Sequence, residues 1–176
     1  MTAPAPSSSV RTGIVQSGQA ALEFALIAPL MLVLMLTVID FSRAIHYMQV
    51  MVSLSRQGSN LASRGTTLPA SAAAVVAGDA PLDLSHNGEV IITSVTNVAL
   101  VNTITGQSSQ GGTSNKSKVG TVIGNRANLP PSTAAMLAPG QTIYVTEIFY
   151  SYKPLTPIAN LLHIVLPSTL YEVAYF

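Results

Sequence analysis

The most regular pattern in this sequence is an apolar run at residues 20–39, in which only Glu23 and Thr37 are polar. About 20 apolar residues in a helix cross a hydrocarbon core of roughly 30 Å. The run therefore predicts a membrane-spanning helix near the start of the chain. Pro29 lies inside it and lacks the N–H that would bond the Ala25 carbonyl, so we expect a kink or a locally melted turn there.

The helical pattern continues beyond the apolar run, because residues 40–64 contain no strong helix breaker before Gly65 and only Gly58 as a weak one. Residues 19–64 are thus predicted to form one helix of about 69 Å at 1.5 Å per residue. Its outer half is expected to cover a sheet with a stripe of apolar residues. On one face these are Phe41, Ile45, Met48 and Val52, with Ala44, Tyr47, Met51 and Leu54 beside them.

Residues 65–176 predict a small domain of strands and short helices. A short helix is indicated at 69–78, a segment that begins with proline and ends with glycine. We also expect one helical turn within 125–140 and an apolar helix at 158–166. Strands are indicated by β-branched and aromatic runs at 90–101, 119–123, 142–152 and 170–176. Residues 106–118 are rich in Gly, Ser and Asn and indicate a loop. The fold class expected is α+β, a long N-terminal helix packed on a small antiparallel sheet.

Composition narrows the possible functions. Charged residues make up only 9% of the chain, against about 25% in an average soluble protein. The net charge is +1 without a block of Lys or Arg, which argues against nucleic-acid binding. Cysteine is absent, and the histidines His46, His86 and His163 are isolated in sequence. We therefore expect no metal, no cofactor and no catalytic residues, so the chain is not predicted to be an enzyme.

Residues 1–18 are rich in Pro, Ser and small residues without a period, so they are expected to be a disordered leader. A secretory signal peptide is the obvious alternative. However, the apolar run exceeds the usual 7 to 15 residues, and no small-x-small cleavage site follows at residues 40–43. Glu23 would cost roughly 2.5–3.5 kcal/mol at mid-bilayer, so it either reaches the interface or has a function.

A glycine, four residues and then Glu-Phe opening an apolar helix resembles the processing site of type IV prepilins. The details are most similar to the TadE-like minor pilins of the tight-adherence (Tad, or Flp) pilus. The residues that carry this resemblance are Q-A-x-x-E-F-A-L-x-x-P-L at 19–30 and Y-S-Y-K-P-L-T-P at 150–157. The resemblance implies cleavage between Gly18 and Gln19 by a prepilin peptidase, and a role in assembly for Glu23, Phe24 and Pro29.

The same resemblance implies partners and a location. The partners would be the membrane, the peptidase, other minor pilins, the major Flp pilin, and the assembly ATPase with its platform. Residues 65–176 would lie in the periplasm or outside the cell, anchored in the inner membrane or carried in a pilus that supports adhesion and biofilm formation. Pro29 would be either a tolerated membrane proline or a point where the helix stretches in a filament.

An alternative is a binding or sensor domain on an uncleaved signal anchor, which leaves the spacing from Gly18 to Phe24 to chance. The charge distribution opposes the expected topology. Only Arg11 precedes the apolar run, whereas Arg43 and Arg56 follow it. By the positive-inside rule alone, the C-terminal domain would lie in the cytoplasm.

Overall fold

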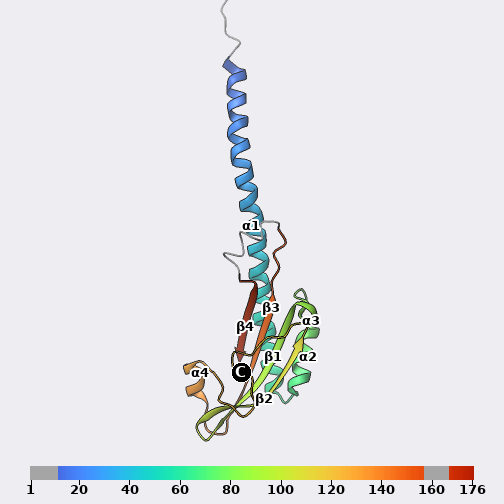
Figure 1. The fold of residues 1–176 in the computed structure, drawn as a ribbon, viewed down its shortest axis with the longest axis vertical. Helices are drawn as coiled ribbons and strands as arrows, with labels where there is room; N and C mark the ends of the chain where they lie inside the picture. Colours follow the sequence, from blue (N-terminus) through green and yellow to red (C-terminus); the bar gives the residue numbers. More distant parts are fainter. Residues whose placement is uncertain (1–11, 157–166) are drawn as a thin grey trace, which may run out of the picture.

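The computed structural model describes residues 12–156 and 167–176. Its dominant element is α1 (Thr12–Ser63), a helix of 52 residues that extends far beyond the domain at one end (Figure 1). The prediction of one long helix is confirmed, and its C-terminal end is correct to one residue. The expectation that the leader lacks structure is wrong for residues 12–18, which are helical. That segment contains no proline, and its glycines cost only about 1 kcal/mol each in a helix.

The helix is also continuous through Pro29, so the locally melted turn expected there is not observed. A missing N–H removes one hydrogen bond, and the many remaining bonds of this helix keep the turn in place.

The domain is built on a four-stranded antiparallel sheet in the order β2-β1-β3-β4. The strands are β1 (Gly88–Val98), β2 (Val101–Gly111), β3 (Thr142–Ser151) and β4 (Thr169–Tyr175). This confirms the α+β, pilin-like arrangement of a long helix on an antiparallel sheet. Within the described part of the domain there are three further, short helices: α2 (Leu68–Ala77), α3 (Leu84–Asn87) and α4 (Pro131–Met136). The helix predicted at 158–166 lies outside the described residues.

Three predictions about the first hairpin are wrong. The strand predicted at 90–101 ends at Val98, because Ala99 and Leu100 turn the chain with φ of 51° and 69°. Such turns usually contain glycine or asparagine, so this one left no signal in the sequence. The chain then returns as β2, which occupies the first part of the predicted loop at 106–118. Residues 119–123 form bends and turns instead of the return strand.

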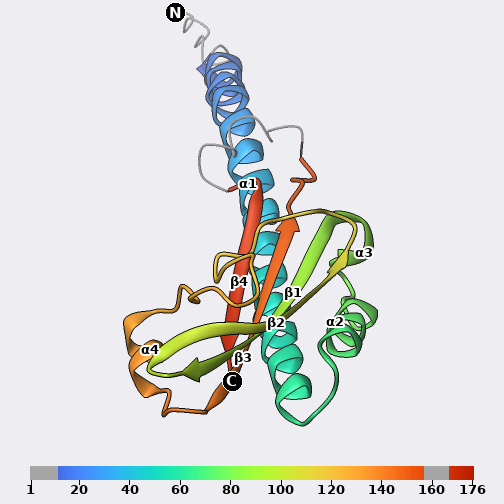
Figure 2. The same cartoon turned by 60° about the horizontal axis from the view of Figure 1, so that its bottom comes forward.

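The sheet is covered on both faces (Figure 2). On one face α1 and α2 pack against it, and the core there includes Met51, Val75, Ile92 and Ile148, all fully buried. On the other face lies the long connection between β2 and β3. Its Val119 is 2% exposed and packs in a second apolar cluster with residues such as Ile104 and Val145, which explains why this apolar stretch is not a strand.

The face of α1 that packs on the sheet is not centred on Phe41, Ile45 and Met48, as the apolar periodicity predicted. Ala44, Met51 and Leu54 are buried, whereas Phe41 and Met48 remain 46% and 45% exposed. The reason is that small residues on one face of α1 allow the helix to approach the sheet closely, so that this face packs on it. They are Ser55, Gly58, Ser59 and Ala62, all of them buried. The bulkier Phe41, Ile45 and Met48, here called the outer stripe, are left on the side of the helix.

Candidate functional site

The predicted processing residues, Gly18 and Gln19, lie on the exposed half of α1, and the predicted assembly residue Glu23 lies one helical turn further along. Gln19 donates a hydrogen bond from Nε2 to Oε1 of Glu23 at 3.2 Å, since residues i and i+4 face each other on a helix. Gly18 has open space around it, with no atom within 4 Å of where a Cβ would stand. The structure therefore brings Gln19 and Glu23 together and leaves Gly18 accessible.

The peptide bond between Gly18 and Gln19 lies inside a helix. A protease needs an extended substrate, so cutting here requires the first turns of α1 to unwind locally. Glycine lowers the cost of that unwinding, because it is about 1 kcal/mol less favourable than alanine in a helix.

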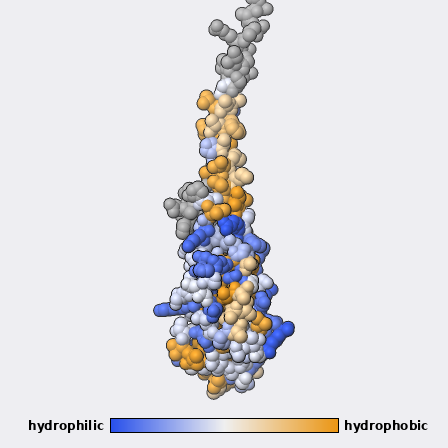
Figure 3. Space-filling model, turned by 90° about the vertical axis from the view of Figure 1, so that its right-hand side faces the viewer, coloured by the Kyte–Doolittle hydropathy of each residue, from blue (hydrophilic) through white to orange (hydrophobic). Residues whose placement is uncertain are grey.

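The other two predicted site residues, Phe24 and Pro29, are exposed as well, with Phe24 at 72%. They share this exposure with most of the apolar run. Among the described residues, one helix is long and apolar enough to cross a membrane, α1 over Gly18–Ser63, and none of its most apolar stretch is buried. Figure 3 shows this apolar surface along α1 and polar residues where the domain begins. Near an N-terminus, such a helix serves as a membrane anchor or a signal.

The residue that joins α1 to the domain was not singled out in the sequence. Asp40, directly after the apolar run, is 0% exposed. Its carboxylate accepts hydrogen bonds from the N–H of Leu155 at 2.9 Å, from the N–H of Thr156 at 3.2 Å, and from the Thr156 hydroxyl. Tyr152 donates its hydroxyl to the Asp40 carbonyl at 2.8 Å. Residues 152–156, here called the strap, thus clamp the helix where it leaves the apolar run.

The strap is part of the second matching motif, Y-S-Y-K-P-L-T-P. The sequence pattern identified this motif but not Asp40, its partner on α1. A polar residue commonly follows the apolar run of a membrane helix, so Asp40 did not stand out. Burial raises the pKa of the Asp40 carboxyl, but the hydrogen bonds from Thr156 and Leu155 outweigh this effect and the pKa lies below its usual value. Asp40 is therefore a buried, ionised acceptor at neutral pH.

An aromatic cluster surrounds the clamp. The ring of Tyr47 meets those of Tyr150 and Tyr152 edge-on, with centroids 5.6 and 5.9 Å apart. Arg43 donates to the Tyr47 hydroxyl at 2.8 Å and lies over its ring. Edge-to-face aromatic pairs contribute about 0.5–1.5 kcal/mol each beyond their buried area. Together with the clamp they fix α1 to the end of β3.

A second buried carboxylate holds the connection that covers the outer face. Glu147 of β3 is 0% exposed and accepts bonds from the Lys118 N–H at 2.8 Å, the Tyr171 hydroxyl at 2.9 Å and the Ser117 hydroxyl. Lys118 extends its ammonium over the Tyr171 ring, 3.4 Å from the centroid. Burial and the nearby Glu147 raise the pKa of the Tyr171 hydroxyl, which stays protonated and donates. This arrangement is structural, since the donors that bond to the oxygens of the Glu147 carboxylate all belong to the protein itself.

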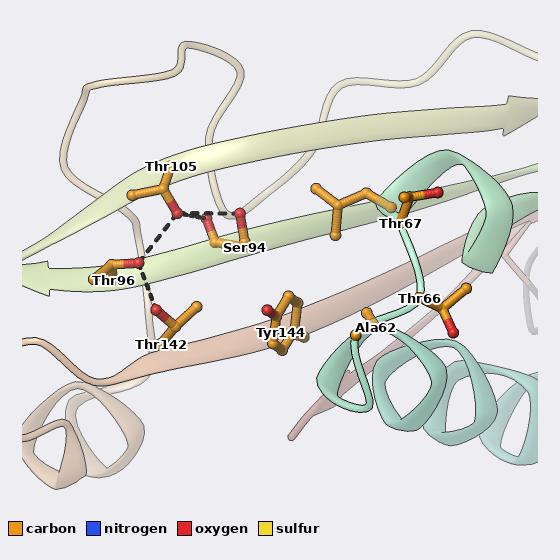
Figure 4. A pocket seen from close by; sticks show the side chains of 10 residues that line it. Ala62, Thr66, Thr67, Ser94, Thr96, Thr105, Thr142 and Tyr144 are labelled. Carbon is orange, nitrogen blue, oxygen red and sulfur yellow. Dashed lines mark hydrogen bonds between the residues drawn. The ribbon is translucent and has the colours of Figure 1, made fainter.

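A shallow hollow of about 340 Å³ lies between the C-terminal end of α1 and the sheet. Hydroxyl groups line it, and Thr96 bonds to Thr105 at 3.1 Å and to Thr142 at 2.8 Å across three strands (Figure 4). Its lining contains no ionisable side chain other than Tyr144. Within residues 12–156 and 167–176, no group of three or more His, Cys, Asp or Glu could hold a metal ion.

A family model described as TadE-like protein matches residues 18–60. The match begins at the glycine of the predicted cleavage site and contains Glu23, Pro29 and Asp40. The matched segment lies entirely within α1 and includes none of the sheet. No curated protein and no solved structure matches the chain.

Proposed function

We propose that this chain, which carries a TadE-like domain, is a minor pilin or pseudopilin of a Tad pilus. A prepilin peptidase would cut it between Gly18 and Gln19. Residues 20–39 would anchor it in the inner membrane, and α1 would then join the helices of other subunits in a pilus or its initiating complex. Its role is structural, and the biology implied is surface adhesion.

The observation that carries this proposal is that the apolar surface of α1 extends beyond residues 20–39, the segment that would lie in the membrane. The outer stripe, Phe41, Ile45 and Met48, continues it past Asp40 with exposed fractions of 46%, 42% and 45%. A simple anchor needs apolar surface only within the bilayer. A helix that packs against other helices after leaving the membrane needs it further along.

The position of Glu23 supports the same proposal. Cutting before Gln19 creates an amine one turn from this carboxylate. When neighbouring helices exclude water, each ion alone would cost several kcal/mol, and pairing the carboxylate of one subunit with the amine of the next offsets that cost. In a pilus, the pairing would also set the axial stagger between this chain and the other pilins packed against it. The partners inferred are other minor pilins, the major Flp pilin, and the assembly ATPase with its platform.

The mass of the mature N-terminus tests the proposal most directly. Protein purified from membranes of cells that contain a prepilin peptidase should begin at Gln19. Gly18→Ala should slow or abolish the cut, whereas Gly13→Ala, the same change five residues earlier in α1, should not. Assembled protein that still begins at Met1 or Thr2 would show that the proposal is wrong.

The location of the domain needs its own test, because the basic residues Arg43 and Arg56 oppose it. A phosphatase fused after Phe176 should be active, since we propose that residues 65–176 lie outside the cytoplasm. A fusion to a reporter that works only in the cytoplasm should be silent. The reverse result would overturn both the topology and the pilin proposal.

A further inference from the structure

Within the part of the chain that the structure describes, the outer edge of β4, the last strand of the sheet, is unpaired. Phe176 and Tyr144 exchange both backbone hydrogen bonds, at 2.8 and 3.0 Å. Because bonding alternates along an antiparallel pair, Tyr171, Val173 and Tyr175 direct their backbone N–H and C=O away from β3. Among the described residues, no hydrogen bond reaches these groups.

Natural sheets usually protect such an edge with proline, lysine, a bulge or a covering loop. β4 reads T-L-Y-E-V-A-Y, contains neither proline nor lysine, and pairs with β3 without a shift in register. The opposite edge differs. The start of β2 is covered by the connection that follows it, through the N–H of Ile104 to the carbonyl of Asn125 at 2.9 Å and the N–H of Ala127 to the carbonyl of Asn102 at 2.7 Å.

Along the remainder of β2, no backbone hydrogen bond between described residues reaches the outer edge of the strand. Gly112 donates its N–H to the carbonyl of Gly88 at 3.0 Å, which fixes the alternation. Gln107, Ser109 and Gly111 therefore direct their backbone groups away from β1. Each edge of the sheet thus presents a run of outward-facing residues that includes Tyr171, Val173 and Tyr175 on β4 and Gln107, Ser109 and Gly111 on β2.

The outward-facing residues of β4 and those of β2 lie at the same level along the strand direction. Across the pairings of the sheet, Val173 is level with Glu147, Ile91 and Ser109. By the same registers, Tyr171 is level with Gly111. Tyr175 is likewise level with Gln107. A second copy placed beside the first, without any axial shift, would bring each free residue of β4 opposite a free residue of β2.

The strand directions fit as well. β4 runs antiparallel to β3, β3 to β1 and β1 to β2, so β4 and β2 run in opposite directions. Two copies with their α1 helices pointing the same way would therefore form an antiparallel β4–β2 pair. Antiparallel pairing of β4 with another β4 would instead point the two α1 helices in opposite directions, which one membrane does not permit.

We propose that copies of this chain associate side by side, with residues 171–175 of one copy paired to residues 107–111 of the next in one continuous sheet. The proposal rests on the proposed function only in that α1 anchors both copies in the same membrane. Opposing side chains are compatible, because Tyr171 would face Gly111 and Glu172 would face Gln110, with no like charges opposite each other. Such an interface is heterologous, so it extends into a row of copies.

Disulfide trapping tests this register, since the chain has no cysteine of its own. Val173→Cys and Ser109→Cys are placed in two differently tagged full-length copies, and membranes of cells that contain both are oxidised. Paired residues have Cα atoms about 5.5 Å apart, within disulfide range. A band of doubled mass that carries both tags is expected. Thr169→Cys with Ser109→Cys is the matched control, because four residues displace the pair by about 13 Å.

Absence of the band, or equal bands from the matched and control pairs, would overturn the proposal. So would a stronger band from Val173→Cys with itself. If either variant fails to accumulate, Tyr175→Cys with Gln107→Cys tests the same register. The outcome is independent of processing: cross-linked but uncut protein would refute the pilin proposal alone, and processed, assembled protein without cross-links would refute the sheet pairing alone.

Discussion

Asp40 and Thr156 are 116 positions apart in the chain, and the hydroxyl and N–H of Thr156 both donate to one carboxylate oxygen of Asp40. This contact joins the end of the apolar run to the strap after β3. Motion of α1 at this level must therefore move the strap, and through it β3.

Asp40→Asn should weaken this junction. The amide offers one acceptor oxygen instead of two, and its NH2 group would face donors. Hydrogen bonds to charged groups contribute about 1.5–3 kcal/mol, so a loss of that order in the free energy of unfolding is expected. Urea unfolding of the full chain in detergent, followed by tyrosine fluorescence, measures it. Glu172→Gln, on the edge strand, is the control and should change little; equal losses in both variants would contradict the clamp.

The clamp should also depend on pH. The folded-state pKa of Asp40 lies below its ordinary value of 3.8. A group with a depressed folded pKa adds stability above its unfolded pKa and loses it as the pH falls through the folded value. The difference in unfolding free energy between wild type and Asp40→Asn should thus be largest near neutral pH and decline below about pH 3.8. A difference that stays constant into this acid range would show that the charge of Asp40 is not what stabilises the junction.

Gly58→Ala should destabilise the domain even though alanine favours a helix. A Cβ at Gly58 would stand 2.9 Å from two side-chain atoms of Thr146 and 3.0 Å from Val75. Overpacking costs about 1–3 kcal/mol and exceeds the gain of about 1 kcal/mol in helix propensity. Gly18→Ala, which meets open space, is the matched control and should not lower the unfolding free energy measured by urea titration. A gain in stability at Gly58 would mean that α1 lies further from the sheet.

The sequence predicted those elements whose signal is local. The long helix, α2, β3 and β4 each have a strong pattern of their own, and their bounds agree with the structure within one or two residues except at the start of α1. The turn at Ala99 and Leu100 has no such signal, because its left-handed backbone is imposed by the pairing of β1 with β2. Val119 also looked like a strand residue, although it is buried as part of the cover on the outer face.

For a related reason, only part of the candidate site leaves a signal in the sequence. Gly18, Gln19 and Glu23 form a short motif within one helix, so their spacing is visible in sequence. Asp40 acts through the strap, more than a hundred residues away, and that contact exists only once the chain has folded. The packed face of α1 was misassigned because hydrophobicity favours the bulky outer stripe, whereas close approach to the sheet favours Gly58 and Ser59.

The outer stripe predicts different effects for two methionines of α1. Met51 is 0% exposed, so Met51→Ala should cost about 2–5 kcal/mol of unfolding free energy. Met48 is 45% exposed, so Met48→Ala should have a much smaller effect on the single chain but reduce incorporation into pili, where we propose that it is covered. Urea unfolding and the amount of the protein in sheared pili separate the two effects. Normal incorporation of Met48→Ala would argue that the outer stripe contacts no other subunit.

Glu23→Gln separates processing from assembly. Removing a charge from an apolar helix makes insertion easier, so the variant should reach the membrane normally. Cleavage should also persist, provided that the peptidase reads mainly Gly18 and the apolar run. Incorporation should fall, because the amine of Gln19 in an adjacent subunit would be buried without a counter-charge, a loss of about 3–5 kcal/mol. Thr37→Val, the other polar position of the run, is the control: its hydroxyl bonds only to the Val33 carbonyl of its own helix, at 2.8 Å. The comparison is of cleaved protein in membranes with protein in sheared pili. Normal pilus output from Glu23→Gln would show that this carboxylate merely reaches the membrane interface and that no charge pair guides assembly.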